Sequence, residues 1–246
     1  MSRTVCWFSC GAASAVATKL ALKERPNAIV AYCEIKEEHP DNKRFLKDCE
    51  RWFGKEIELL GSDRHSRSIY EVFRKERFLV GPGGAKCTAV LKKGVRKKFQ
   101  KDGDLQIFGY TMEEQGRADR FIDANPQVEA MFPLIDKGLS KSDCLALLAK
   151  EGIELPAMYK LGYNNNNCVG CVKGGAGYWN KIRKDFPEQF EKMSKMERYL
   201  GRTVTKHKGK RVFLDQLPKD AGHPVKDLPV SCSFNCEYIE FERKEK

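Results

Sequence analysis

Residues 5–20 read VCWFSCGAASAVATKL, and this stretch decides the fold. The apolar run at residues 5–9 predicts a short β-strand, and the alanine-rich run at 12–23 has helical spacing. Free N–H groups at the start of a helix bind anions, and the small residues of the turn let the backbone approach one closely. A tight turn that only packs helix on strand would have the same composition. The anion-binding hypothesis concerns Ser9, Gly11, Ala12 and Ser14.

Predicted strands and helices alternate over the first 150 residues. Strands are expected at residues 5–9, 28–35, 56–60, 105–109 and 128–135, and helices at 12–23, 41–53, 68–78, 88–100 and 140–150. This alternation favours an α/β fold, a parallel sheet with helices on both faces. Ligands of such sheets bind beyond the carboxyl ends of the strands. The candidate turns therefore follow residues 9, 35, 60 and 109.

The pattern changes after residue 155. An asparagine- and glycine-rich loop precedes two expected helices, at residues 176–184 and 187–200, and an irregular tail that contains cysteines. The turn at 9–14 contains neither a Walker loop nor a Gly-x-Gly-x-x-Gly motif. We expect an α/β domain over residues 1–160, and a cysteine-bearing helical appendage over 161–246 packed on that domain.

Composition narrows the range of partners and compartments. The 246 residues include 45 Lys and Arg against 34 Asp and Glu, a net charge of +11 that favours an anionic partner such as a nucleotide or a nucleic acid. No run of 18 apolar residues exists, so we expect no membrane span. Residues 3–17 loosely resemble a secretory signal, but the strand–turn–helix interpretation suits them better. We expect a cytoplasmic protein whose ten cysteines are not paired in disulfides.

The turn resembles the Ser-x-Gly-x-x-Ser PP-loop of the adenine nucleotide α-hydrolase-like superfamily. Further segments, in the right order, resemble the phosphoadenosine phosphosulfate (PAPS) reductase family: EIKEEHPD at 34–41, KCTAVLKK at 86–93, GYTMEE at 109–114, PLID at 133–136, PAMYKLGY at 156–163 and CVGC at 168–171. The likeness covers residues 4–175. It implies a PP-loop domain that binds an adenine nucleotide. Beyond the turn, the binding residues that it implies are Glu34, Lys92, Gly109, Arg117 and Arg120.

Three positions depart from the family pattern. Ala13 stands where many PP-loops have an Asp, which the resemblance assigns to magnesium in the ATP-cleaving members. Its absence weakens the hypothesis of Mg-ATP chemistry and leaves phosphosulfate binding open. Thr111 replaces an Arg that follows the fourth strand, and Lys137 replaces a Trp. The identity of the substrate therefore stays open at this point.

The cysteines suggest three different sites. The Cys-x-x-Cys pair at 168 and 171 directs two thiolates toward one centre, as zinc or an iron–sulfur cluster requires. The resemblance implies a [4Fe-4S] cluster on Cys87, Cys168, Cys171 and a tail cysteine, for which we favour Cys236. A structural zinc on the pairs 168/171 and 232/236 is the alternative, and unligated or redox-active thiols are the third. We expect the remaining five cysteines to be buried: Cys6, Cys10, Cys33, Cys49 and Cys144.

The resemblance also implies a reaction. In the family a C-terminal cysteine attacks sulfur, and we assign this role to Cys232. The leading hypothesis is a sulfonucleotide (PAPS or adenosine phosphosulfate) reductase that releases sulfite, with a thioredoxin-like electron donor. One alternative is an ATP-dependent adenylating sulfurtransferase that acts on a nucleic acid. Another is a non-catalytic nucleotide- or nucleic-acid-binding protein. The basic segment KHKGKR at 206–211 is expected to be a flexible loop, either for solubility or for contact with an RNA backbone.

Overall fold

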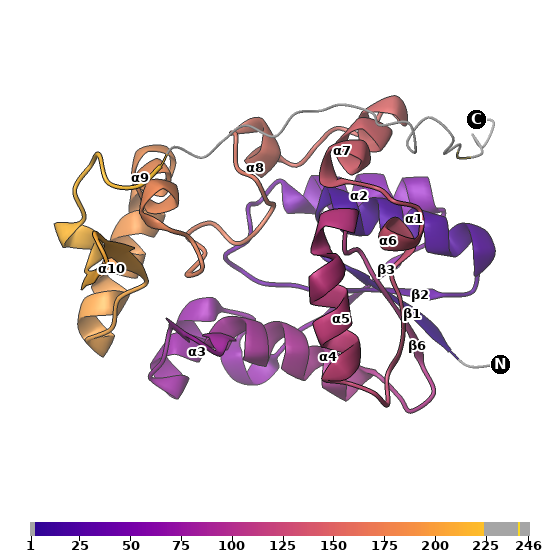
Figure 1. Ribbon diagram of the computed structural model, residues 1–246, viewed down its shortest axis with the longest axis horizontal. Helices are drawn as coiled ribbons and strands as arrows, with labels where there is room; N and C mark the ends of the chain where they lie inside the picture. Colours follow the sequence, from indigo (N-terminus) through magenta and orange to yellow (C-terminus); the bar gives the residue numbers. More distant parts are fainter. Residues whose placement is uncertain (1–2, 224–240, 242–246) are drawn as a thin grey trace.

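A parallel sheet of five strands lies at the centre of the molecule (Figure 1). The computed structural model describes residues 3–223 and residue 241. All four strand pairings in the sheet are parallel, which confirms the fold class predicted from the alternation. The order is β3-β2-β1-β6-β7, formed by β1 (Thr4–Phe8), β2 (Ile29–Cys33), β3 (Ile57–Leu60), β6 (Leu105–Phe108) and β7 (Glu129–Met131).

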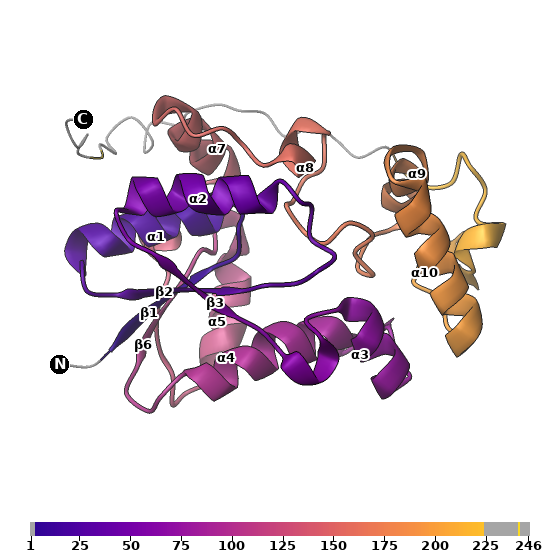
Figure 2. The same cartoon turned by 180° about the vertical axis from the view of Figure 1, so that it is seen from behind.

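Helices cover both faces of this sheet, as Figures 1 and 2 show. One face carries α1 (Ala12–Glu24), α2 (Asn42–Phe53) and α7 (Lys141–Lys150); the other carries α3 (Ile69–Glu76), α4 (Gly94–Phe99) and α5 (Gln115–Asp123). The chain runs from β1 outward to β3 and then returns to β6, on the other side of β1. The strand order therefore reverses beside β1, and the carboxyl end of β1 is where such a sheet binds its ligand.

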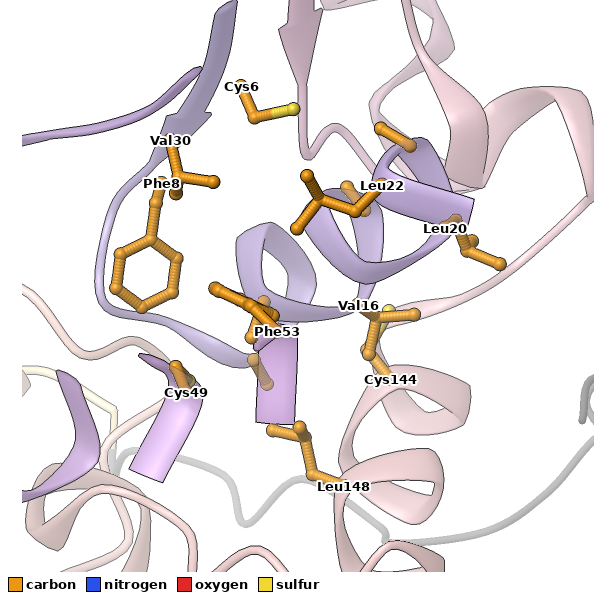
Figure 3. Packing of buried hydrophobic residues seen from close by; sticks show 14 of the residues in the cluster. Cys6, Phe8, Val16, Leu20, Leu22, Val30, Cys49, Phe53, Cys144 and Leu148 are labelled. Carbon is orange, nitrogen blue, oxygen red and sulfur yellow. The ribbon is translucent and has the colours of Figure 1, made fainter. Parts of the chain in front are cut away.

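The larger hydrophobic core lies between the sheet and the α1, α2 and α7 face. Figure 3 shows its packing: Phe8 and Val30 from the strands face Val16 of α1, Phe53 of α2 and Leu148 of α7. The helix α1 is rich in alanine, so its backbone packs closely on β1 and β6. Burial of these side chains, each contributing about 1.5–3 kcal/mol, fixes the position of the turn that joins β1 to α1.

A second core lies toward one end of the molecule. It joins α3 and the segment around Leu91 with α9 (Ala176–Asp185) and α10 (Pro187–Leu200), around the buried Trp179. The short helix α8 (Ala157–Lys160) leads into this end of the chain (Figure 2). The second core draws on described residues both before and after position 160. The boundary at residue 160 itself stays a prediction.

Several elements differ from the sequence-based expectations. The strand expected at 128–135 ends at Met131, because Pro133 begins the helix α6 (Pro133–Asp136). The helix expected at 88–100 consists of a π-helical segment, Thr88–Lys93, followed by α4. A small hairpin of β4 (Val80–Gly81) and β5 (Gly84–Ala85) surrounds the expected glycine loop.

The basic segment at 206–211, expected to be a flexible loop, is a second hairpin. It consists of β8 (Thr205–His207) and β9 (Lys210–Val212). Lys208 and Gly209 form the turn, and both have a positive φ, the conformation that joins two-residue hairpins. No helix in the described part of the chain is both long and apolar enough to cross a membrane.

Candidate functional site

The turn between β1 and α1 has the form of an anion-binding loop. The helix begins after Gly11, and its first turn carries no acidic side chain. The Ser14 hydroxyl accepts hydrogen bonds from the backbone N–H of Ser9 (3.0 Å) and from the Ser9 hydroxyl (3.0 Å), and it donates one to the Gly11 carbonyl (2.9 Å). Cys10 between them is buried with φ 58°, a strained conformation of the kind that functional loops retain. The structure thus places Ser9, Gly11, Ala12 and Ser14 together.

Position 109 has no room for a side chain, because the turn between β1 and α1 lies directly against it. A Cβ atom at residue 109 would lie 2.6 Å from the Cα of Ser14 and 2.8 Å from its backbone nitrogen. The residue after β6 therefore presses directly on the first turn of α1, and any larger side chain would displace the loop. Gly109 and the loop form one continuous surface at the carboxyl edge of the sheet.

The asparagine-rich segment folds over the loop from the other direction. The Asn166 side-chain amide donates to the Cys10 carbonyl (2.5 Å) and to the Asn42 side-chain oxygen (2.8 Å), and Asn166 is buried. The Tyr159 hydroxyl accepts backbone hydrogen bonds from Ala12 and from Asn166. These contacts bring the chain just before Cys168 against the turn, although more than 150 residues separate them.

An ion pair with one buried partner, Glu38, and one partly exposed partner, Lys92, lies between the loop and the thiols. The Lys92 ammonium lies 3.3 Å from a carboxylate oxygen of Glu38, whose side chain is 3% exposed and also accepts hydrogen bonds from Tyr32 and Asn42. Burial alone would lower the pKa of Lys92, but Glu38 and then Cys168 outweigh it and raise that pKa. Lys92 also lowers the pKa of Cys10, against the stronger raising effect of burial. The Lys92 charge therefore acts on the loop and on the Cys-x-x-Cys segment at the same time.

Three of the four proposed metal ligands lie near one another. Burial and the neighbouring Cys171 thiol raise the pKa of Cys87 to about 11. The pKa of Cys168 is raised chiefly by burial, with contributions from Cys171 and Cys87. The Tyr178 hydroxyl holds the segment in place by accepting from the N–H groups of Gly170 (3.1 Å) and Cys171 (2.8 Å).

The thiols of Cys87, Cys168 and Cys171 are of the chemical type that both zinc and an iron–sulfur cluster take as ligands. Within residues 3–223 and 241, no group of three or more His, Cys, Asp or Glu side chains is arranged to hold one metal ion. Cys87, Cys168 and Cys171 are all partly exposed, and Cys87 and Cys168 pack against the second core. Whether these thiols hold a [4Fe-4S] cluster or a zinc ion, with a further ligand from the tail, stays a prediction.

Other predicted residues occupy different surroundings. Glu34 pairs with Arg67, and Arg117 pairs with Glu114 and lies 4.1 Å from the centre of the Tyr110 ring. Arg120 is exposed on α5. Their roles in nucleotide binding stay predictions. Cys232 and Cys236 lie outside the described residues, so the nucleophile and the fourth ligand stay predictions as well. The other five cysteines are buried, as expected.

The structure adds residues that the sequence did not single out, and it distinguishes Arg96 from the other cations of the helix expected at 88–100, which the sequence offered as a group for binding phosphates. Glu38, and not the predicted Glu34, pairs with Lys92. The sequence could not distinguish Glu38, because positions 34–41 contain four acidic residues. Tyr159 and Asn166 touch the turn only because the chain returns to it after α7. The side chain of Arg96 lies at the same edge, with its guanidinium 5.4 Å from the centre of the Phe108 ring. Its position four residues after Lys92 was the available signal, because such a spacing places two helical side chains on one face.

Comparison with known proteins identifies the family. A family model described as the phosphoadenosine phosphosulfate reductase domain matches residues 3–175. The chain belongs to this family, which confirms the resemblance seen in the motifs. No curated protein matches it. Among solved structures it is similar to the U34-tRNA thiolase NcsA from Methanococcus maripaludis with its [4Fe-4S] cluster. The identity is 12%, with 81% of this chain and 72% of that chain covered and a TM-score of 0.45, which says nothing about what this chain acts on.

Proposed function

We propose that the chain binds an adenosine phosphosulfate at the Ser9–Ser14 loop and reduces it with release of sulfite. The observation that carries the proposal is the hydrogen bond from the Asn166 amide to the Cys10 carbonyl (2.5 Å), which holds the segment leading to Cys168 against the loop. An anion held by the loop would lie within reach of thiol chemistry. The absence of an acidic side chain in the first turn of α1 favours a phosphosulfate over Mg-ATP, because that turn offers no carboxylate for the metal.

The proposed reaction balances with a dithiol donor. The Cys232 thiolate attacks the sulfur of the phosphosulfate; an S–S bond forms while the O–S bond breaks, and the nucleotide phosphate leaves with the electron pair. A thiolate of a thioredoxin-like protein then attacks the Cys232 sulfur and displaces sulfite. The second donor thiol resolves the mixed disulfide and restores Cys232, so the donor leaves oxidised and its two protons pass to the products.

The chain's own residues would position the substrate for this attack. The N–H groups at the start of α1 and the hydroxyls of Ser9 and Ser14 would bind phosphate oxygens, and Lys92 would offset their charge. Cys87, Cys168, Cys171 and Cys236 would hold the [4Fe-4S] cluster. When bound, the cluster would supply an iron–sulfur centre that fixes three distant segments beside the loop.

Sulfite release tests the proposal. Protein purified without oxygen is incubated with adenosine 5′-phosphosulfate or its 3′-phosphorylated form, a thioredoxin and a thioredoxin reductase. We expect the wild type to release sulfite and Cys232→Ser to release none. Without the thioredoxin donor, the wild type should accumulate the protein-bound thiosulfonate. The matched variant Cys236→Ser should lose iron and sulfide instead. Sulfite release that is unchanged in Cys232→Ser would contradict the assigned nucleophile, and one bound zinc without sulfide would contradict the cluster.

The basic hairpin favours a second candidate, an ATP-dependent sulfurtransferase that acts on a nucleic acid. Lys206 lies directly opposite Arg211, and both are exposed. Like charges in such a pair repel each other, so the arrangement favours a polyanion that lies across the hairpin. Residues 202–211 contain five Lys and Arg and no acidic residue. This surface is compatible with RNA binding, whereas the turn at Ala13 argues against Mg-ATP.

Two measurements separate the candidates. Pyrophosphate release from ATP that depends on added RNA would support the sulfurtransferase and contradict the reductase. Nucleotide binding with neither product would support a non-catalytic binding protein. For the hairpin, we replace Lys206, Lys208 and Lys210 by Gln and measure RNA affinity at several salt concentrations. The slope of log K against log salt concentration should become less steep by about 0.7 for each phosphate contact that is lost. The control replaces the equally exposed Lys97, Lys98 and Lys101, and equal slopes would exclude the hairpin as the RNA surface.

A further inference from the structure

Arg96 carries a charge that nothing in the described part of the chain neutralises. Its guanidinium lies 5.4 Å from the centre of the Phe108 ring and 5.0 Å from that of Phe121. Its Nε atom is buried and has no hydrogen-bond partner, and within residues 3–223 and 241 its guanidinium forms no ion pair. The ring contacts attract a cation but provide no acceptor for the Nε–H group. A buried N–H donor without an acceptor is costly, unless an acceptor is supplied from outside the chain, and an anion would also pair with the charge of the partly exposed guanidinium.

The position of Arg96 indicates which anion that is. Phe108 is the last residue of β6, and Cys33 is the last residue of β2; these strands flank β1 in the sheet. Arg96 contacts Phe108 and acts on the ionisation of Cys33, so its guanidinium lies at the carboxyl end of β1. This is the end from which the anion-binding turn emerges. Lys92, about one helical turn earlier, lies on the same side.

We propose that Arg96 binds oxygens of the phosphate or phosphosulfate group held by the Ser9–Ser14 loop, as a second cation beside Lys92. The inference rests on the proposed nucleotide binding at that loop. Lys92 is already paired with Glu38, so its charge is partly offset before a ligand arrives. Arg96 has no such partner, and its planar fork of N–H donors suits a tetrahedral oxyanion. Arg96 therefore distinguishes a charged nucleotide from a neutral nucleoside.

Calorimetric titration of three ligands tests this role: adenosine 5′-phosphosulfate, AMP and adenosine. We expect Arg96→Met to weaken binding of the two anions by about 10- to 100-fold, the effect of a lost charge-assisted hydrogen bond, and to leave adenosine unchanged. Lys97→Met is the matched control, because it removes the same charge from the exposed neighbouring residue. Arg96→Lys should recover only part of the affinity, because an ammonium cannot form the bidentate contact. Equal anion affinities in wild type and Arg96→Met would overturn the proposal.

A measurement without nucleotide keeps the inference separate from the proposed function. In ligand-free buffer Arg96→Met should unfold at the same temperature as the wild type or at a higher one, because methionine covers the rings without an unpaired charge. Sodium sulfate, compared with sodium chloride of equal ionic strength, should stabilise the wild type and Lys97→Met more than Arg96→Met. A purely structural Arg96 would show a lower midpoint and no sulfate difference, which would overturn the inference. Absence of sulfite release together with the expected sulfate difference would overturn only the reductase.

Discussion

The loop end and the thiol end of the candidate site are built in different ways. The loop end consists of consecutive residues between β1 and α1, and the larger core under α1 supports it. The thiol end combines Cys87 with a segment some 80 residues later and depends on the second core around Trp179. Local sequence therefore determines the first end, whereas the second end forms only when distant segments fold together. Lys92 and Asn166 connect the two ends.

Breaking this connection should have the largest effect. Lys92→Met leaves the carboxylate of Glu38 buried without its cation. We expect the free energy of unfolding to fall by about 3 kcal/mol, the lower end of the range for a broken buried pair, because Lys92 is 36% exposed and Tyr32 and Asn42 still donate to Glu38. The control Lys93→Met removes an equal charge from an exposed neighbour and should change stability by less than about 0.5 kcal/mol. Urea denaturation measures both. The double variant Lys92→Met/Glu38→Gln should recover part of the loss, and a double variant as unstable as the sum of its single variants would show that the pair is not coupled.

A substitution at Gly109 tests the loop end alone. Gly109→Ala places a methyl group 2.6 Å from the Ser14 backbone, so we expect a loss of about 2–3 kcal/mol and weaker binding of AMP. Gly83→Ala is the matched control, since a Cβ there would meet nothing within 4 Å. Thermal unfolding and AMP titration provide the readouts. Gly109→Ala with normal stability and normal AMP affinity would show that the close contact with α1 does not shape the loop.

The same contrast explains how far the sequence could be interpreted. The run at 5–20 predicted strand, turn and helix correctly, because the apolar pattern and the small turn residues act within a few positions. The parallel sheet followed from alternation, and the helix expected at 41–53 matches α2, which Gly54 caps. Local periodicity failed at 128–135, where Pro133 starts a helix, and at 206–211, where a turn with positive φ forms a hairpin.

The candidate site was less predictable than the fold. The resemblance suggested Lys92, but its partner Glu38 could not be distinguished from neighbouring acids, because burial and not residue type selects it. The contact of Asn166 with the Cys10 carbonyl spans 156 positions, so no local pattern encodes it. In the sequence, Arg96 is one of five Lys and Arg residues in the helix expected at 88–100, and nothing distinguishes it from the others. Only the structure shows that its Nε atom is buried without a hydrogen-bond partner. Long-range packing therefore determines what the motifs leave undecided.

The pH dependence of stability sharpens the description of the thiol end. Glu197 of α10 is fully buried and accepts hydrogen bonds from the N–H groups of Val204 and Leu214 (both 2.6 Å). Burial raises its pKa to about 7, and nearby Asp215 adds to the shift while both N–H groups and Arg198 oppose it. The folded state then holds a proton that the unfolded state releases above its ordinary pKa of 4.5, so this group's stabilisation decreases as the pH rises from about 4.5 to 7.

We expect Glu197 to contribute a loss of about 2 kcal/mol between pH 5 and pH 7. Glu197→Gln does not titrate, so its unfolding free energy should show a correspondingly flatter profile over this interval. Glu188→Gln, at an exposed position in the first turn of the same helix, is the control and should retain the wild-type slope. Urea denaturation at half-unit pH steps measures all three proteins. Parallel profiles for wild type and Glu197→Gln would refute the assignment.

The smallest expected effect concerns the Cys-x-x-Cys segment itself. Tyr178→Phe removes the hydroxyl that accepts from Gly170 and Cys171, and we expect a loss of about 1 kcal/mol in unfolding free energy. Tyr199→Phe is the control because Tyr199 is 58% exposed. Because the lost hydroxyl orients the segment that carries two thiols, hydrogen exchange at residues 168–172 should quicken in Tyr178→Phe, while exchange within α1 stays unchanged. Faster exchange in both regions would instead mean that the loop end and the thiol end unfold as one cooperative unit, and the distinction between them would not hold.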